Sequence, residues 1–391
     1  MSRPGVARPL LLSDGDAAEL TARLWAAAEA GTPVAVLDPA WPRALRRAAE
    51  DALDRADLPD GSLVLFTSGS SGRPRGVIRT AASWQASVGG LTDITGVGAD
   101  DVVWLPGSPT STMTLYGGWH ATAVGAEVRG AEGWPRGAPP AGVTALHAAP
   151  RVLAAAVSTA ERDRLRDVRV AVVAGAPLPA ELRARADGLG WRIVEYYGAA
   201  ELSFVAWREK TVSYQRFPGV AVEIRASEIW ARSAYLCEGY LTPDDDGPLR
   251  KDGSWATVGD LGREQDDGLH VLGRGDAAVT TGGRTVVVEE VESAIREHPA
   301  APAGMDDVVV TSIPHPLLGE LLVAVVAVAG PPDSTLSRAA LDRTVSGLPD
   351  WSRPRRWWLV EELPRTSTGK PDRAAVRLGV RHRTLTDRPL R

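Results

Sequence analysis

The sequence predicts an α/β protein with a large first domain and a small α+β domain at its C-terminal end. Short apolar runs alternate with helical stretches over the first half of the chain, closely spaced strands and turns follow Tyr214, and a smaller unit begins at Asp276. Strands interleaved with helices favour largely parallel pairing, whereas strands joined by short turns favour an antiparallel or barrel-like sheet. We therefore expect two domains, over residues 1–275 and 276–391.

The strands expected in the first half are short apolar runs of the kind that sheets bury on both faces. They cover Leu63–Thr67, Val102–Leu105, Val143–Leu146, Val168–Val173 and Arg192–Tyr196. The helices expected between them cover Ala81–Thr92, Pro150–Ala160 and Pro179–Leu189.

The pattern changes after Tyr214, where Val220–Ile224 and Glu228–Ala231 are strands separated by a short turn. Beyond Asp276 the predicted order is strand, helix, two strands and a final helix. These elements cover Thr285–Val288, Glu289–Glu297, Val308–Ile313, Leu321–Val328 and Leu336–Gly347.

Composition excludes several classes of protein. The net charge of the 391 residues is −5 and no basic block stands out, which argues against a nucleic-acid partner. No apolar stretch approaches the ~20 residues of a membrane span, and the N-terminal residues lack the features of a secretory signal. A single cysteine, Cys237, excludes a disulfide framework, and the six histidines form no i, i+4 pair. We expect a cytoplasmic protein with small-molecule partners.

Lysine is rare in this chain, so composition alone is a poor explanation for a lysine within a motif. Lys210, Lys251 and Lys370 are the only three, which leaves 41 arginines among the 44 basic residues. An arginine at a position where another protein uses lysine is therefore unsurprising here.

A loop rich in glycine and serine follows the strand at Leu63–Phe66. Backbone N–H groups and hydroxyl donors at this density suit an oligophosphate, with Arg75 as the charged partner. The loop is not a Walker A motif, because no Gly-Lys-Ser/Thr follows it. Taken alone it would be interpreted as a surface turn. Its residues are Thr67, Ser68, Gly69, Ser70, Ser71, Gly72, Arg73, Pro74, Arg75 and Gly76.

Four further motifs follow this loop in order along the chain. They are Glu195–Glu201, Thr257–Asp260, Gly273–Glu292 and Leu363–Lys370. Together with the loop they resemble the motifs of the adenylate-forming (ANL) superfamily, which includes acyl- and aryl-CoA synthetases, adenylation domains and luciferases. The resemblance implies an N-terminal domain of stacked mixed sheets with flanking helices and a barrel-like piece, followed by a small C-terminal domain that changes orientation between two steps. Because only 66 residues precede the loop, the N-terminal part looks trimmed.

The implied reaction has two steps: a carboxylate attacks the α-phosphate of ATP and releases pyrophosphate, then a second nucleophile takes the acyl group. The resemblance assigns the β- and γ-phosphates to Thr67–Gly72 and Arg75. It assigns Lys370 to the α-phosphate and the substrate carboxylate, and Glu201 to Mg²⁺, a hard cation that prefers carboxylate oxygen. Catalysis would rest on positioning and charge neutralisation.

The same resemblance assigns residues to the adenine and the ribose of ATP. Tyr197, beside Gly198, would stack on adenine, Glu195 would accept from its amino group, and Asp260 would bind the ribose hydroxyls. Arg274 would lie against ribose and phosphate. Asp276 would be the hinge residue of the C-terminal domain. The other face of adenine would contact Gly175, Ala176 and Pro177.

Each of these residues also has a simpler interpretation when taken singly. Tyr197 could be a core aromatic, Glu201 and Asp260 could cap a helix or turn, and Arg274 could form a surface ion pair. Lys370 could be a solvated loop lysine. The order of five motifs over residues 66–370 favours the functional interpretation.

Two departures from the family pattern concern the active site. Ala200 replaces the threonine that precedes the glutamate, so a hydroxyl expected to touch the adenylate phosphate is missing. No histidine lies in Leu105–Pro109, where many acyl-CoA synthetases carry an aromatic-histidine pair. The acid pocket is expected to be lined by Trp84, Ser108, Met113 and His147. Its many small residues indicate a modest acid, with an aromatic acid as one candidate.

Three functions remain open at this stage. The first is an acid–CoA ligase that uses ATP, Mg²⁺ and CoA. The second keeps the activation but delivers to an amine or a carrier-protein thiol, or activates a substrate other than a carboxylate. The third is an inactive nucleotide-binding paralogue, against which the retained Glu201, Asp260, Arg274 and Lys370 argue. The oligomeric state is left open.

Overall fold

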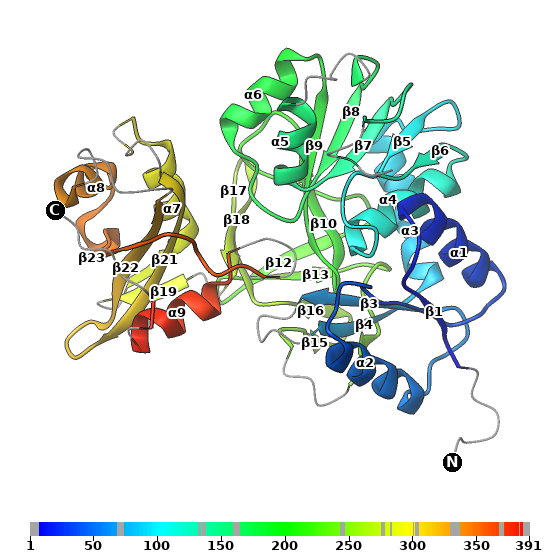
Figure 1. Cartoon of the computed structure of the whole chain (residues 1–391), viewed down its shortest axis with the longest axis horizontal. Coiled ribbons are helices and arrows are strands. Elements are labelled where there is room, and N and C mark those ends of the chain that lie inside the picture. The colour runs from blue at the N-terminus through cyan, green and yellow to red at the C-terminus, as the bar shows by residue number, and fades with distance from the viewer. Residues whose placement is uncertain are drawn as a thin grey trace. The chain divides into compact units, whose positions relative to one another are not determined.

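The structure is a computed structural model of the whole chain (Figure 1). It describes residues 8–68, 74–131, 134, 138–158, 165–242, 247–274, 278–281, 284–299, 301, 305–328, 337–366, 371–382 and 384–385. These residues form two compact units. The first runs to Val258 and includes Arg263–Val271, and the second comprises Gly259–Gly262 and the chain from Leu272 onward. The predicted boundary at residues 275 and 276 lies outside the described residues and stays a prediction.

The first sheet of the first unit has the strand order β1-β2-β3-β4-β14. Strands β1 to β3 are parallel, and β4 and β14 run antiparallel to their neighbours. Side chains alternate across it: Leu63 and Leu65 join the main core, while Val64 packs in a smaller cluster with Leu53 of α2. Its elements are β1 (Leu10–Leu12), α1 (Ala17–Glu29), β2 (Val34–Val36), α2 (Arg43–Arg55), β3 (Ser62–Ser68), β4 (Pro74–Thr80) and β14 (Gly239–Tyr240).

The second sheet has the order β11-β10-β9-β8-β7-β5-β6, and the pairs from β9 to β6 are parallel, as predicted. Along β8, Val170 enters the main core and Val173 enters the cluster beneath α5 and α6, so helices cover both faces (Figure 1). Its elements are α3 (Ala81–Thr95), β5 (Val102–Trp104), α4 (Thr112–Ala123), β6 (Glu127–Arg129), β7 (Ala145–Ala148), α5 (Pro150–Ser158), β8 (Val170–Val173), α6 (Ala180–Gly188), β9 (Arg192–Ala199), β10 (Ser203–Arg208) and β11 (Gln215–Arg216).

The third sheet corresponds to the predicted antiparallel piece. Its order is β15-β16-β13-β17-β18, with β12 paired to β13. The strands are β12 (Ala221–Arg225), β13 (Glu228–Arg232), β15 (Arg250–Asp252), β16 (Trp255–Thr257), β17 (Asp260–Gln265) and β18 (Gly268–Arg274).

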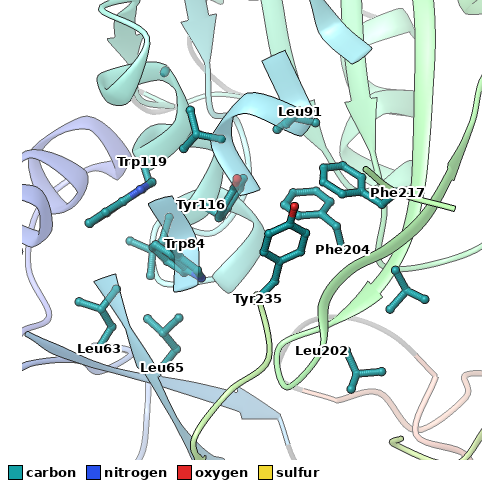
Figure 2. Close-up of a cluster of buried hydrophobic side chains, with 14 of the residues drawn as sticks. Leu63, Leu65, Trp84, Leu91, Tyr116, Trp119, Leu202, Phe204, Phe217 and Tyr235 are labelled. Atoms are coloured by element: carbon teal, nitrogen blue, oxygen red, sulfur yellow. The ribbon is translucent and has the colours of Figure 1, made fainter. Parts of the chain in front are cut away.

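Aromatic side chains fill the centre of the first unit (Figure 2). Trp84 meets Tyr116 edge to face at 5.4 Å, Tyr116 meets Phe204 at 4.8 Å, and Phe204 stacks on Phe217 at 4.5 Å. These residues come from α3, α4, β10 and the segment after β11. Aromatic pairs of this geometry contribute about 0.5–1.5 kcal/mol each beyond area burial.

The second unit is the predicted α+β unit. Its sheet has the order β20-β19-β22-β21, with β23 parallel to β22. Along β21, Val308 and Val310 face the cluster with α7 and α8, while Val309 faces the cluster with α9. Its elements are β19 (Ala278–Thr281), β20 (Arg284–Val287), α7 (Val288–Glu297), β21 (Met305–His315), β22 (Gly319–Val328), α8 (Arg338–Thr344), β23 (Arg356–Val360) and α9 (Arg373–His382), with a short 3₁₀ turn at Asp350–Ser352.

The predicted α/β class is confirmed, and the predicted elements are found with ends shifted by a few residues. The first helix of the second sheet begins as expected at Ala81, because Thr80 caps it by accepting from the Ser83 N–H. Sequence patterns did not predict four helices and thirteen strands of the described part of the chain. They are α1, α2, α4, α9, β1, β2, β4, β6, β10, β11, β14, β15, β16, β17, β18, β19 and β23. No helix among the described residues has the length and hydropathy needed to cross a membrane.

Candidate active site

A cavity of about 220 Å³ opens at the carboxyl ends of β3, β8 and β9 in the first unit. Ligands of α/β proteins bind at this edge of the sheet, because strand-to-helix loops converge there. The lining is mostly aromatic and small. It consists of Thr67, Arg79, Trp84, Thr112, Met113, Tyr116, Ala174, Gly175, Tyr196, Gly198, Ala199, Ala200, Ser203 and Phe204.

The cavity brings together residues that the motifs had assigned to different parts of one site. Thr67 comes from the phosphate loop, Gly175 and Gly198 from the nucleoside motifs, and Trp84 and Met113 from the expected acid pocket. The other expected pocket residues are not in this lining. Ser108 is exposed, with its hydroxyl 3.4 Å from that of Thr110. Ala176 and Pro177 are exposed beyond β8.

The strands that flank the phosphate loop form an antiparallel hairpin. Thr67 on β3 pairs with Arg75 on β4, and Arg75 is buried at 8% exposure. The hairpin therefore holds the expected charged partner opposite the start of the loop. The side chain of Ser68 and the residues Gly69, Ser70, Ser71 and Gly72 lie outside the part that the structure describes.

Strand β9 presents its two tyrosines differently. Tyr196 lines the cavity and packs on Phe204 at 4.5 Å, whereas Tyr197, the residue expected to stack on adenine, does not line it. Successive residues of a strand point to opposite faces, which explains the difference. Gly198 permits the tight β9–β10 hairpin, because a Cβ there would lie 2.0 Å from the Ser203 carbonyl oxygen. The adenine-stacking role of Tyr197 stays a prediction.

Glu195 is held by the protein itself. Its Oε1 accepts from Arg208 and from the Tyr214 hydroxyl, each at 2.7 Å, and its Oε2 accepts from Arg183 at 2.7 Å. The residue is 1% exposed, so this network satisfies a buried carboxylate. These contacts give no support to the expected hydrogen bond with adenine. They make Glu195 the anchor of the β9–β10 hairpin.

The turn between β9 and β10 carries Ala200 and Glu201, and the neighbouring layer fixes it at three points. Arg79 donates to the Ala200 carbonyl, and the Cys237 N–H donates to the Glu201 carbonyl at 2.9 Å. The Tyr240 hydroxyl donates to Glu201 Oε1 at 2.9 Å. Glu201 is 5% exposed, and the hydrogen bond from Tyr240 engages only Oε1 of its carboxylate. Glu201 thus offers one carboxylate oxygen to an external partner.

A single carboxylate of this kind fits Mg²⁺, which binds through one or two carboxylates together with waters and substrate phosphates. Across the described ranges no group of three or more His, Cys, Asp or Glu residues could hold a metal ion. The single carboxylate of Glu201 fits a cation that takes its other ligands from waters and substrate phosphates.

Arg79 is a buried cation that the motifs did not reveal. It is 1% exposed, donates to the carbonyls of Ala200 and Tyr235, and has no partner for its Nε within the described part of the chain. Burial lowers its pKa to about 10, against the opposing effect of Cys237 and Glu201, so it remains charged at neutral pH. Its one signal in the sequence is an arginine inside the apolar run that follows the loop.

His147 does not line the cavity, contrary to the expectation. It is buried in β7 with its ring 6.4 Å from that of His120, and neither His147 Nε2 nor His120 Nδ1 has a hydrogen-bond partner among the described residues. Burial lowers the pKa of His147 to about 3 and that of His120 to about 4. Both rings are neutral core residues at pH 7.

Four expected site residues lie in the second unit or outside the described residues. Asp260 begins β17 and is 6% exposed. Arg274 ends β18, and its side chain is outside the described part. Asp276 and Lys370 are also outside the described residues. Their roles stay predictions.

Comparison with known proteins identifies the family. Residues 10–241 match the model for the AMP-binding enzyme, and residues 290–370 match that for the AMP-binding enzyme C-terminal domain. The chain belongs to the AMP-binding enzyme family. The resemblance to adenylate-forming enzymes and the predicted two-part architecture of the family are thereby confirmed.

This AMP-binding enzyme is similar to named ligases. It is 32% identical to a probable 2-succinylbenzoate–CoA ligase of Mycobacterium tuberculosis, over 81% of this chain and 84% of the relative. It is 27% identical to a 4-chlorobenzoate–CoA ligase of Arthrobacter, over 84% and 68%. The fold matches the o-succinylbenzoate CoA synthetase MenE of Bacillus subtilis with a TM-score of 0.75 at 18% identity, covering 96% of this chain and 88% of that one.

Proposed function

We propose that this enzyme is an AMP-forming ligase that activates a small aromatic carboxylic acid and transfers it to CoA. The observation that carries the proposal is the composition of the cavity. On one side the cavity is lined by Thr67, at the start of the phosphate loop, and by Ala200, in the turn after β9. On the other side it is lined by the aromatic side chains of Trp84 and Tyr116. An acid seated between those aromatics would present its carboxylate toward the phosphate-binding side.

In the first step a carboxylate oxygen attacks the α-phosphorus of ATP, the bond to the bridging oxygen breaks, and pyrophosphate leaves. Arg75 would hold the departing phosphates, and Lys370 would neutralise charge at the α-phosphate. Glu201 would bind Mg²⁺, which supplies neutralising charge along the phosphate chain. In the second step the CoA sulfur attacks the carbonyl carbon of the acyl-adenylate, and AMP leaves.

The volume and the lining of the cavity also limit the size and the shape of the acid. Its volume of about 220 Å³ is below the ~300–1,000 Å³ of pockets for drug-sized ligands. Trp84, Tyr116, Tyr196 and Phe204 supply aromatic surface for a planar ring. Aromatic acids are also what the names of the two similar ligases specify. We therefore propose a small aromatic acid, and a cytoplasmic enzyme with access to ATP and CoA.

Pyrophosphate release from ATP tests the proposal. The enzyme with Mg²⁺ is assayed against benzoate, substituted benzoates and short aliphatic acids, with and without CoA, and thioester is quantified in parallel. We expect acid-dependent release and a CoA thioester. Release without thioester would indicate another acceptor, such as an amine or a carrier-protein thiol. The absence of release with every acid would contradict the proposal.

A further inference from the structure

The hydroxyl of Tyr240 makes two hydrogen bonds whose directions are fixed. Its oxygen accepts from the backbone N–H of Leu249 at 3.2 Å, and its proton goes to Oε1 of Glu201 at 2.9 Å. A backbone N–H can only donate and an ionised carboxylate can only accept, so the orientation of the hydroxyl follows from its neighbours.

The ring of Tyr240 is closely packed. Gly247 lies against it, and a Cβ at position 247 would come within 2.3 Å of the ring. Tyr240 itself is held by β14, where it pairs with Val77 of β4.

Two backbone contacts fix the turn that carries Glu201. Arg79 donates to the carbonyl of Ala200, and the Cys237 N–H donates to the carbonyl of Glu201. Because Oε1 is engaged by Tyr240, the oxygen left for an external partner is Oε2. A carboxylate fixed in this manner loses little conformational freedom when it binds a cation.

We propose that Tyr240 is a positioning residue for the metal-binding carboxylate of Glu201, holding Oε1 so that Oε2 is presented to the divalent cation that accompanies ATP. This inference rests on the proposed role of Glu201. Tyr240 touches neither substrate nor metal, and its effect passes through the carboxylate. Outer-sphere hydrogen bonds of this type set the orientation and basicity of metal ligands.

The test is the affinity for Mn²⁺ in the presence of a saturating, non-hydrolysable ATP analogue, measured by electron paramagnetic resonance on the full chain. Tyr240→Phe removes only the hydroxyl. Its matched control is Tyr235→Phe, since the Tyr235 hydroxyl is also buried against the protein but donates to the Pro218 carbonyl at 2.7 Å. We expect Tyr240→Phe to weaken Mn²⁺ binding about 10-fold and the control to change it less than about twofold.

A double-mutant cycle separates this role from general support of the fold. Glu201→Gln should weaken Mn²⁺ binding, and adding Tyr240→Phe to it should cause little further loss, because the hydroxyl acts through the carboxylate. Thermal melting of each variant establishes that it is folded. In Tyr240→Phe the Mg²⁺ concentration for half-maximal pyrophosphate release should rise. The factor of this rise should exceed the factor by which the rate at saturating Mg²⁺ falls.

Two outcomes would overturn the inference. One is an unchanged Mn²⁺ affinity in Tyr240→Phe. The other is a loss that is equally large in the Glu201→Gln background. Either result would leave acid-dependent pyrophosphate release by the wild-type enzyme intact, so the proposed function would stand. A wild-type enzyme that released no pyrophosphate and bound no Mn²⁺ with the analogue would contradict both.

Discussion

The guanidinium of Arg373 binds the buried carboxylate of Glu292 through two hydrogen bonds of 2.6 Å each. Arg373 begins α9 and Glu292 lies in α7, so this ion pair joins two helices. The two residues are 81 positions apart in the chain. The Val310 N–H of β21 adds a bond of 2.7 Å to Oε1. One carboxylate therefore connects α7, β21 and α9 of the second unit. Arg373, which forms part of this connection, closely follows Lys370 in the chain.

Glu292→Ala should destabilise the second unit by about 3–5 kcal/mol, because it leaves a charged partner and a backbone donor without their acceptor. Urea unfolding gives the magnitude, and hydrogen–deuterium exchange should localise the loss to α7, β21 and α9. Glu290→Ala is the matched control, since Glu290 is an exposed carboxylate on the same helix. We expect a change within about 0.5 kcal/mol there. Equal stability of the two variants would show that the ion pair adds nothing.

Lys370→Ala should reduce acid-dependent pyrophosphate release by about 10²–10³-fold, as expected when one group that neutralises transition-state charge is removed. Transfer from a supplied acyl-adenylate to CoA should persist, because that step does not build charge on the α-phosphate in the same way. Lys210→Ala is the control, because Lys210 is exposed and belongs to none of the motifs. Pyrophosphate release near the wild-type rate in Lys370→Ala would contradict the assignment.

Ala200→Thr should speed adenylation. Ala200 lines the cavity at the turn before Glu201. The family pattern that the sequence resembles has a threonine at this position. A hydrogen bond to a charged group contributes about 1.5–3 kcal/mol, so we expect pyrophosphate release to rise by about 10- to 150-fold. Ala200→Val supplies the same shape without the hydroxyl and should not accelerate the step. Equal rates in the two variants would assign the effect to packing.

The sequence predicted the family, because its motifs lie in short segments that can be recognised without knowing the fold. Thr67, Gly175 and Gly198 were found in this way and share one cavity. Elements with weak patterns were missed. The helix α2, for example, has Ala49 and Leu53 as its buried residues, too few for a clear apolar stripe.

The partners of the charged groups could not be predicted, since they depend on contacts between distant segments. Arg79 and Tyr235 are 156 residues apart in the chain, yet the Arg79 side chain donates to the Tyr235 carbonyl. The resemblance assigned Glu195 to adenine. The two arginines and the tyrosine hydroxyl that bind its carboxylate come from α6, from β10 and from the segment before β11, and only the packing of these segments brings them together.

Burial of His120 and His147 should make the folded enzyme sensitive to mild acid. In an unfolded chain each ring titrates near pH 6.5. In the folded protein the pKa values are about 4 and about 3, lowered by burial. The unfolded state therefore binds more protons below pH 6.5, and the free energy of unfolding should fall as the pH drops from 7.5 to 5, by about 1–2 kcal/mol per ring. The loss should end near the folded pKa values.

His147→Gln isolates the contribution of one ring, because glutamine does not titrate in this range. The variant will differ in absolute stability, so the measured quantity is the difference in unfolding free energy between pH 7.5 and pH 5, obtained from urea titrations of each protein. That difference should shrink by about 1–2 kcal/mol relative to the wild type. His382→Gln changes an exposed histidine at the end of α9 and should leave it unaltered. If both variants keep the wild-type difference, His147 titrates with an ordinary pKa in the folded protein, and its burial does not govern the response to acid.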